Sequence, residues 1–294
     1  MSTKIIKILT PKRLLLNGLL IDNQRSKILF IFVHGLSGNL FSRSELANHL
    51  VNSGAAALVF NNRGYGIINK FRQFRPRSEK KYQVKIFGQA HEVFSDCLDD
   101  LDGAINFGVR AGYKKIILVG RSTGCNKIAY YLSQKSPTVI KGAVLLAPVS
   151  DYSIVRRDFP TTKLKRVVGY AQHLVKAGRA HELLPTKIWP EIIDAQRFLS
   201  LYTPESLEEI FSYAVPTKKP TILQKIKKPL LICLAAEDEF GDRSAEKIAA
   251  WFKSALVKQS GELKIISGAN HSFSKQAVKL QKIIAVWISK LKNF

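Results

Sequence analysis

The feature that most constrains the fold is a series of short apolar runs that alternate along the chain with segments of helical periodicity. The runs are apolar on both faces and stop at small or polar residues, which is typical of parallel strands covered by helices on both sides. We place these strands at Ile28–Val33, Ala55–Phe60, Lys115–Val119, Ala143–Leu146, Leu230–Ala235 and Leu263–Ile266. The alternation predicts an α/β fold with a mostly parallel central sheet.

Helices are predicted between the strands because apolar residues recur there every three to four positions. The segment His91–Val109 has such a stripe, and we expect its acidic residues Asp99, Asp100 and Asp102 on a solvated face. The other elements predicted on either side of the strands are helices at Asn126–Gln134 and Ser274–Leu291, and an N-terminal hairpin that includes Leu14–Ile21.

The regular alternation stops between the fourth and fifth of these strands. Thr162–Lys176 has helical periodicity, and a second helix is predicted at Thr203–Phe211, where threonine followed by proline matches the start of a helix. A structureless loop of this length would be unusual in a compact domain. We therefore expect an α/β core formed by residues 1–150 and 229–294, with residues 151–228 inserted as a helical lid.

The chain is strongly basic, with 46 Lys+Arg against 22 Asp+Glu and a formal net charge of +24. This charge leaves an anionic substrate, an anionic lipid surface or nucleic acid open as a partner. Many of the basic residues lie in Arg63–Lys85, where Phe71, Phe74 and Tyr82 are interleaved with them. We expect this stretch to be a solvated loop or a rim that contacts anions. Dedicated nucleic-acid binding is disfavoured because no recognised binding module is present.

Cysteine usage and hydropathy indicate the cellular compartment in which the protein is expected. Cys97, Cys125 and Cys233 are far apart and odd in number, so neither a disulfide framework nor a zinc site is predicted. The first residues lack the apolar core and cleavage site of a signal peptide, and no stretch of about 18 apolar residues could span a bilayer. We expect a cytoplasmic protein that needs no metal or organic cofactor, and the sequence leaves its oligomeric state open.

One short motif points to chemistry. Residues 120–124 have the pattern G-x-S-x-G with Ser122 at its centre, directly after a predicted strand and directly before a predicted helix. The pattern alone is common, but the strand–turn–helix context is what a nucleophile elbow requires. Glycines on both sides let the backbone turn sharply without Cβ clashes. We therefore predict that the Ser122 hydroxyl is presented at the N-terminus of a helix.

A serine hydroxyl needs a base, and the base needs a carboxylate that orients it. His271 follows the last predicted strand, so it is expected at the carboxyl edge of the sheet, where ligands bind in open α/β folds. The preceding strand is followed by an acidic cluster, Glu237, Asp238, Glu239 and Asp242. The chain order of serine, acid and histidine is that of a hydrolase triad.

Two backbone N–H groups are candidates for an oxyanion hole. Thr123 directly follows the serine, and Leu36 lies in the loop after the first central strand, within His34-Gly35-Leu36-Ser37-Gly38-Asn39. These are the two positions from which α/β-hydrolases supply such donors. We expect His34 to orient this loop rather than to react.

The chain resembles the α/β-hydrolase superfamily in its esterase/lipase and serine-aminopeptidase-like branch. The matching pieces cover nearly the whole chain and occur in family order, namely residues 34–39, Arg63-Gly64-Tyr65-Gly66, residues 120–124, Ala147-Pro148-Val149, Asp238 and Asn270-His271-Ser272-Phe273. The resemblance implies an α/β-hydrolase fold with Ser122 as nucleophile, Asp238 as orienting acid and His271 as base. Asp151 stays open as the acid, because some relatives place the acid after the strand that precedes it.

The resemblance implies a serine hydrolase, most simply a carboxylesterase that cleaves a small acyl ester through an acyl-enzyme. A peptidase or aminopeptidase-like enzyme, a lipase-like enzyme and a non-catalytic protein that binds polyanions through its basic face stay open. The predicted lid contains eight apolar or aromatic side chains that either line an acyl pocket or pack against one another. They are Tyr170, Leu174, Leu183, Leu184, Trp189, Phe198, Tyr202 and Phe211. The physiological substrate is not determined by the sequence.

Overall fold

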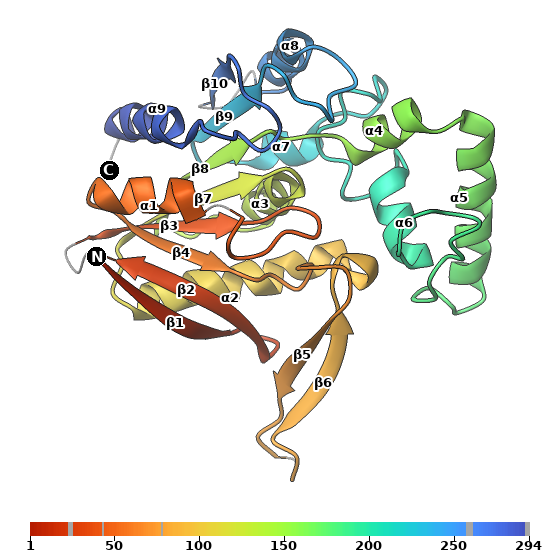
Figure 1. Ribbon diagram of the computed structural model, residues 1–294, viewed down its shortest axis with the longest axis horizontal. Helices are drawn as coiled ribbons and strands as arrows, with labels where there is room; N and C mark the ends of the chain where they lie inside the picture. Colours follow the sequence, from red (N-terminus) through yellow and green to blue (C-terminus); the bar gives the residue numbers. More distant parts are fainter. Residues whose placement is uncertain (23–25, 43, 78, 257–260, 292–294) are drawn as a thin grey trace.

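A ten-stranded mixed sheet forms the centre of the molecule (Figure 1). A computed structural model describes residues 1–22, 26–42, 44–77, 79–256 and 261–291. Its strand order is β10-β9-β8-β7-β3-β4-β2-β5-β6, and β1 pairs with β2 outside this path. The α/β class predicted from the sequence is confirmed.

The parallel half of the sheet is the half predicted from the apolar runs. Its strands are β3 (Ile28–Val33), β4 (Ala56–Phe60), β7 (Lys115–Arg121), β8 (Ile140–Leu146), β9 (Leu230–Ala235) and β10 (Gly261–Ile266). The remaining strands pair antiparallel and are β1 (Ser2–Leu9), β2 (Leu14–Asp22), β5 (Asn69–Phe74) and β6 (Tyr82–Phe87). Because β7, β8, β9 and β10 run parallel, the loops after them meet at one edge of the sheet.

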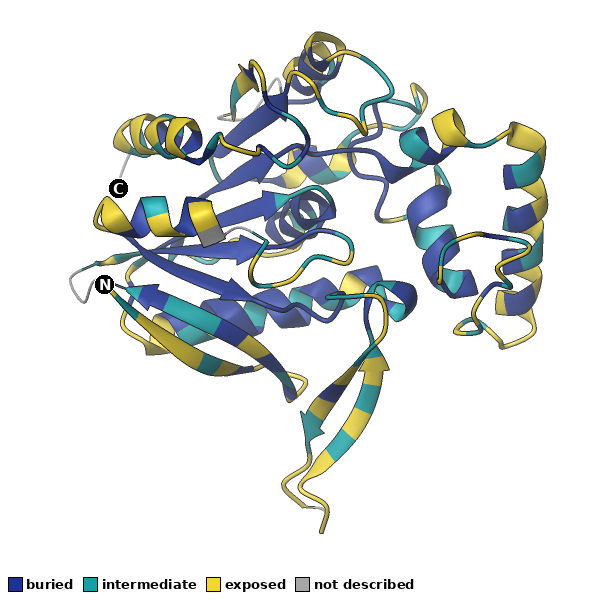
Figure 2. Ribbon diagram, in the orientation of Figure 1, coloured by how far each residue is buried: buried dark blue, intermediate teal, exposed yellow. Residues whose placement is uncertain are grey.

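Helices cover both faces of the sheet with their buried sides turned inward (Figure 2). On one face lie α1 (Ser44–Asn52) and α9 (Ala277–Ser289). The other face is covered by α2 (Cys97–Arg110), α3 (Thr123–Gln134), α7 (Thr221–Lys225) and α8 (Ala245–Ala255). The first part of the helix predicted at His91–Val109 is instead two short 3-10 turns, η1 (Gln89–His91) and η2 (Phe94–Asp96).

The acidic residues of α2 correct one expectation. Asp99 and Asp100 are buried rather than solvated, and both pair at 2.7 Å with the guanidinium of Arg63. Arg63 follows β4, so the sequence separates it from α2 by more than thirty residues. Only the fold brings this buried cation to the helix face, where it compensates two carboxylates that could not otherwise be buried. Asp102 remains half-buried and pairs with Lys135.

Residues 151–202, the first part of the predicted insert 151–228, stand beside the sheet as a helical insert with its own small core (Figure 1). Its helices are α4 (Asp151–Asp158), α5 (Thr161–Lys176) and α6 (Ala195–Tyr202). Trp189 is fully buried and packs against the rings of Phe159, Phe198 and Tyr202. Most of the aromatic and apolar residues considered for an acyl pocket therefore pack against one another, and Phe211 joins the main core.

The helix predicted at Thr203–Phe211 is wrong, because α6 ends where that helix was to begin. Asp194 caps the start of α6 by accepting the N–H of Arg197 at 2.7 Å. Thr203 is extended, with φ −118° and ψ 142°, which is the conformation that a following proline favours. The Thr-Pro pair thus ends one helix instead of starting another.

The basic stretch forms an arm that the sequence analysis did not predict as strands. Strands β5 and β6 pair antiparallel and project away from the helices and the rest of the sheet (Figure 1). The available signal was the alternation of apolar and polar residues in Tyr82-Gln83-Val84-Lys85-Ile86. It was hidden by the density of basic residues around it. No helix of the described ranges is long and apolar enough to cross a bilayer.

A buried contact ties the start of the insert to the segment that returns from it. Ser150 caps α4, and its hydroxyl donates to Glu209 at 2.6 Å while its N–H donates to the Tyr213 hydroxyl at 3.0 Å. Burial raises the pKa of Glu209 to about 7 against its hydrogen bond from Ser150. The folded protein therefore holds a proton on Glu209 that the unfolded chain releases at lower pH.

We predict that this proton makes stability fall as pH rises. Because the pKa of Glu209 is higher in the folded protein than in the unfolded chain, its proton stabilises the folded state fully when the pH is below the ordinary glutamate pKa. This stabilisation is lost as the pH rises from about 4.5 to about 7. The loss amounts to about 3 kcal/mol of unfolding free energy. Urea unfolding at pH 5 and pH 8 should show a smaller decrease for Glu209→Gln than for wild type. Equal decreases in both proteins would contradict the assignment.

Candidate active site

Ser122 occupies a sharp turn between β7 and α3. Its φ is 54°, a left-handed conformation that is strained for serine and is typical of a nucleophile elbow. A Cβ at Gly120 would lie 2.7 Å from the Gly124 carbonyl oxygen, and one at Gly124 would lie 2.2 Å from the Val33 oxygen. Both glycines of the motif are therefore required by close backbone contacts, and Ser122 is left half-buried at the start of α3.

His271 and Asp238 form a hydrogen-bonded pair at the same edge of the sheet. Asp238 Oδ1 and Oδ2 lie 3.0 Å and 2.9 Å from His271 Nδ1. The carboxylate therefore accepts a proton from Nδ1, which leaves Nε2 as the basic nitrogen. Glu239 fixes the loop by accepting the His271 N–H at 2.8 Å, and the Phe240 ring packs edge-on against the imidazole at 4.8 Å.

The alternative acid, Asp151, lies in the helical insert. Burial, together with the neighbouring Glu208 carboxylate, raises the pKa of Asp151 well above its ordinary value. A carboxyl group that favours its neutral form is poorly suited to stabilising an imidazolium. The pairing of His271 with Asp238 and this burial both favour Asp238 as the orienting acid.

The chain neighbours of Ser122 and His271 meet directly. Arg121 donates from Nη1 to the Ser272 hydroxyl at 3.3 Å. Both residues line a cavity of about 430 Å³ together with Phe41 and Phe273. Within the described part of the chain, neither Ser122 Oγ nor His271 Nε2 makes a hydrogen bond, and the His271 side chain is buried.

The loop that holds Leu36 is fixed beside the elbow by His34. The imidazole donates from Nδ1 to the Gly35 oxygen at 2.9 Å and accepts the Asn62 N–H at Nε2 at 3.1 Å. Burial and the nearby Lys127 ammonium lower the pKa of His34 to about 3, so the ring is neutral and structural. A Cβ at Gly35 would lie 3.0 Å from the Ser122 Cβ, which places the loop against Ser122.

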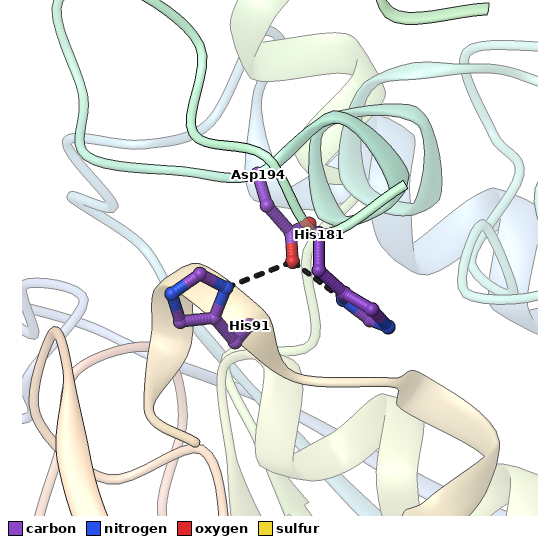
Figure 3. Close-up of side chains that lie close together, drawn as sticks. All are labelled: His91, His181 and Asp194. Atoms are coloured by element: carbon purple, nitrogen blue, oxygen red, sulfur yellow. Dashed lines mark hydrogen bonds and ion pairs between the residues drawn. The ribbon is translucent and has the colours of Figure 1, made fainter. Parts of the chain in front are cut away.

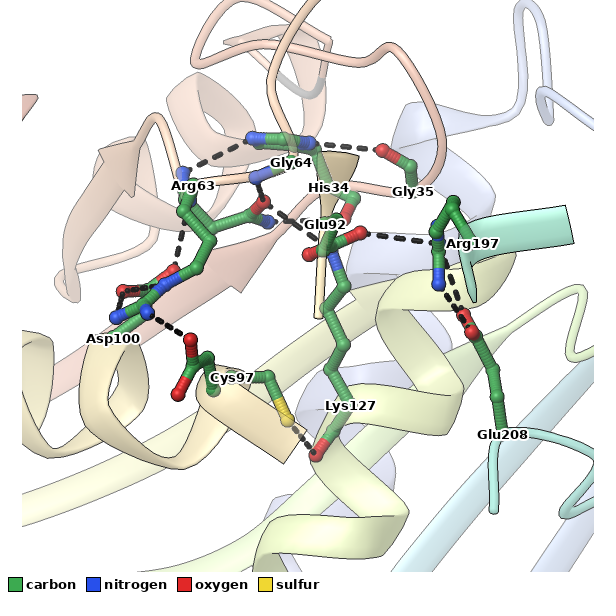
Figure 4. A network of polar contacts seen from close by, with 12 residues as sticks. His34, Gly35, Arg63, Gly64, Glu92, Cys97, Asp100, Lys127, Arg197 and Glu208 are labelled. Atoms are coloured by element: carbon green, nitrogen blue, oxygen red, sulfur yellow. Dashed lines mark hydrogen bonds and ion pairs between the residues drawn. The ribbon is translucent and has the colours of Figure 1, made fainter. Parts of the chain in front are cut away.

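A buried ion network supports this loop and was missed by the sequence analysis (Figure 4). Lys127 of α3 pairs with Glu92 at 2.6 Å, and Glu92 pairs with Arg197 of the insert at 3.1 Å. Arg197 also pairs with Glu208, and all of these side chains are almost fully buried. Although burial opposes ionisation, Lys127 and Arg197 hold the pKa of Glu92 below its ordinary value.

The network reaches the loop through Asn62. Lys127 Nζ donates to Asn62 Oδ1 at 3.2 Å, and the same oxygen accepts the Gly64 N–H at 3.0 Å. A Cβ at Gly64 would lie 2.5 Å from the Glu92 carboxylate, so this glycine leaves room for the buried acid. The only sequence signal for Lys127 was its place in a helix whose other positions are almost all apolar or small.

Among the described residues, one group has the types and spacing of metal ligands. His91, His181 and Asp194 gather between the insert and the core, with their ligand atoms within 4.8 Å of one another (Figure 3). The group shares no residue with the proposed triad. The cysteine spacing predicts no zinc site, and the separation of these three residues along the chain gives no signal for the group.

A family model matches residues 88–292, which is more than half of the chain. The chain belongs to the DUF1749 family. That family is described as a protein of unknown function, so membership of DUF1749 does not assign an activity. The match spans Ser122, Asp238 and His271 but begins after the Leu36 loop. No curated protein matches the sequence.

Solved structures show the fold that this DUF1749 chain shares. The siderophore hydrolase EstB from Aspergillus fumigatus is similar with a TM-score of 0.69 and 17% identity, over 100% of this chain and 99% of that one. The Pyrococcus furiosus esterase PF2001 has a TM-score of 0.61 and 19% identity, with 99% and 91% covered. The α/β hydrolase GrgF from Penicillium sp. sh18 has a TM-score of 0.65 and 16% identity, with 99% and 98% covered. The α/β-hydrolase fold expected from the sequence is confirmed.

We predict that the Lys127 ion pair is a major determinant of stability. Lys127→Met would leave the buried Glu92 carboxylate with one of its two cations removed, and breaking a buried pair costs about 3–5 kcal/mol. Lys135→Met serves as the matched control, because Lys135 at the end of the same helix forms a half-exposed pair with Asp102. That pair should contribute less than about 1 kcal/mol. Urea unfolding of both variants measures the difference, and equal losses would contradict the prediction.

Proposed function

We propose that the protein is a serine carboxylesterase with Ser122, His271 and Asp238 as its catalytic triad. The observation that carries the proposal is the His271–Asp238 pair at the sheet edge that also presents Ser122 on a strained turn. The similarity to structures described as an esterase and a siderophore hydrolase supports hydrolysis. An acyl ester is the substrate class that fits all of these features.

The reaction begins when Ser122 Oγ attacks the acyl carbonyl and its proton passes to His271 Nε2. Asp238 holds the imidazole through Nδ1 and stabilises its cationic form. The carbonyl oxygen becomes an oxyanion, which the N–H groups of Leu36 and Thr123 stabilise. Removing one such donor typically costs about 3 kcal/mol. Catalytic hydrogen bonds often tighten only with substrate bound, so the missing Ser122–His271 hydrogen bond is compatible with a resting enzyme.

The second half of the reaction returns the enzyme to its starting state. The tetrahedral intermediate collapses, the C–O bond of the ester breaks, and His271 gives its proton to the leaving alcohol. Water then attacks the acyl-enzyme, with His271 taking its proton, and the acid product leaves as the Ser122 hydroxyl is restored. No metal or organic cofactor takes part in this scheme.

An aminopeptidase would need an acidic side chain to anchor the substrate's N-terminal amine, and three carboxylates of the insert that could do so are already engaged. Glu182 pairs with Arg179 at 2.6 Å, and Glu191 accepts the Tyr202 hydroxyl at 2.7 Å. Asp194 is fully buried and contacts two histidines. None of these contacts leaves a carboxylate free in the way that recognition of a substrate ammonium requires. We further propose that the insert acts as a lid.

We predict that the triad variants lose ester hydrolysis to different extents. On a short-chain chromogenic ester, Ser122→Ala and His271→Ala should each lower kcat by roughly 10⁶-fold and Asp238→Asn by roughly 10⁴-fold, as in other serine triads. Ser133→Ala, a serine elsewhere on α3, should keep full activity. A fluorophosphonate should label wild type and Ser133→Ala but not Ser122→Ala.

The outcomes separate catalysis from binding. Retention of the wild-type rate by Ser122→Ala would show that another group is the nucleophile. A folded wild type that neither hydrolyses esters nor reacts with the fluorophosphonate would favour a non-catalytic role. Activity on peptides that exceeds activity on esters would favour the peptidase alternative.

We propose a second role for the basic arm, which is to contact an anionic lipid surface. Residues that lie directly opposite one another in β5 and β6 share a face of the arm. On one face, each cation or aromatic ring of β5 lies opposite an apolar or aromatic side chain of β6. The pairs are Lys70 with Ile86, Arg72 with Val84, and Phe74 with Tyr82. Tyr82, Val84 and Ile86 are exposed. Alternating basic and apolar groups suit the lipid headgroup boundary, and the net charge favours an anionic one.

We predict that the arm carries binding to anionic vesicles. Wild type should cosediment with phosphatidylserine vesicles and not with phosphatidylcholine vesicles, and added salt should weaken the binding. The double variant Lys70→Glu/Arg72→Glu should bind more than roughly tenfold more weakly, at about 1 kcal/mol per basic residue lost. Lys253→Glu, an exposed lysine on α8, is the control. Retention of duplex DNA without vesicle binding would overturn this proposal.

A further inference from the structure

A cluster of two histidines and one aspartate lies where the insert meets the core, away from the proposed triad (Figure 3). His91 belongs to η1 in the core, whereas His181 and Asp194 come from the insert. One carboxylate oxygen, Asp194 Oδ2, lies 3.0 Å from His91 Nδ1 and 2.8 Å from His181 Nδ1. The two imidazoles therefore converge on one atom from opposite sides of the junction.

The Asp194 carboxylate is unusual because it is fully buried without a cationic side chain against it. Its other oxygen accepts the N–H of Arg197 at the start of α6. Within the described residues, the nearby guanidinium of Arg197 pairs instead with Glu92 and Glu208, and no lysine or arginine pairs with Asp194. A buried carboxylate needs compensation from its surroundings. A bound cation would supply it.

We propose that His91, His181 and Asp194 bind a divalent transition-metal ion such as Zn²⁺, which fastens the helical insert to the core. Two imidazole nitrogens and one carboxylate oxygen are donors that Zn²⁺ and Co²⁺ accept. Ligand atoms held at about 2.0–2.1 Å from a tetrahedral ion lie about 3.3 Å apart, close to the observed nitrogen-to-oxygen distances. The metal replaces the two hydrogen bonds, with each imidazole proton carried on Nε2.

The surroundings provide the adjustment and the open position that this ion needs. The His181 side chain is 61% exposed, so its ring can move to complete the coordination. Both histidines also line a cavity of about 440 Å³ together with Lys85, Phe87 and Val93. A water molecule can reach the fourth position of a tetrahedral ion from this cavity.

The buried thiols of the chain do not compete for such an ion. The described cysteines Cys97, Cys125 and Cys233 are all buried. Burial raises the pKa of the Cys97 and Cys233 thiols, which keeps them protonated, and a thiol must lose its proton to bind a metal.

The exposed His173 on α5 lies in the same insert and offers a matched control for the histidine variants of the proposed site.

The test is metal binding by the full-length protein after treatment with a chelator. Zn²⁺ alone, followed by calorimetry, should bind at one site, and Co²⁺ should give the visible absorption of a tetrahedral centre. His181→Ala and His91→Ala should each weaken binding by at least tenfold, whereas His173→Ala should bind as wild type does. Zn²⁺ should also raise the unfolding temperature of wild type and His173→Ala, but not that of His181→Ala.

Two results would overturn the proposal, leaving the cluster as a hydrogen-bonded contact between insert and core. One is the absence of saturable Zn²⁺ and Co²⁺ binding by folded wild type. The other is equal affinity in wild type and His181→Ala. Asp194 is left unchanged because it also caps α6. Because the His181 side chain is mostly exposed, His181→Ala should fold. Its Zn²⁺ affinity therefore tests the proposal even if His91→Ala does not fold. The result is independent of the esterase proposal.

Discussion

The buried ion network from Lys127 through Glu92 and Arg197 to Glu208 is the interaction on which the rest of the structure depends. Charges removed from water are tolerable only when each has a close partner, so the network fixes α3, the insert and the segment that returns from it in one arrangement. Because Lys127 also holds Asn62, and Asn62 holds His34, the position of the insert and the shape of the Leu36 loop are set together.

The proposed active site combines two kinds of constraint. The strained Ser122 turn is held by backbone contacts that exclude a Cβ at either motif glycine, so this part of the site is rigid. His271 and Asp238 lie on loops after β10 and β9 and are held by side-chain hydrogen bonds. In the proposed function, a serine on a rigid turn acts with partners on loops, and substrate choice then depends on the surrounding loops and insert.

The insert and the arm extend this common core in different directions. The insert closes its own aromatic core around Trp189, and buried polar contacts of Arg197 with Glu92 and of Asp194 with His91 join it to the core. The arm exposes apolar and basic side chains on a paired strand edge. Exposed apolar groups of this kind are costly in water unless a partner covers them, which is why the arm is interpreted as a contact surface.

The sequence by itself determined the parallel strands, the Ser122 elbow and the small set of carboxylates that includes Asp238. These features depend on local patterns, namely apolar runs, glycine spacing and chain order. Only the tertiary structure decided that Arg63 neutralises Asp99 and Asp100, that Lys127 and Glu92 are buried together, and that His91, His181 and Asp194 meet. The physical reason is that a buried charge is permitted by its partner, and partners distant in sequence are brought together only by the fold.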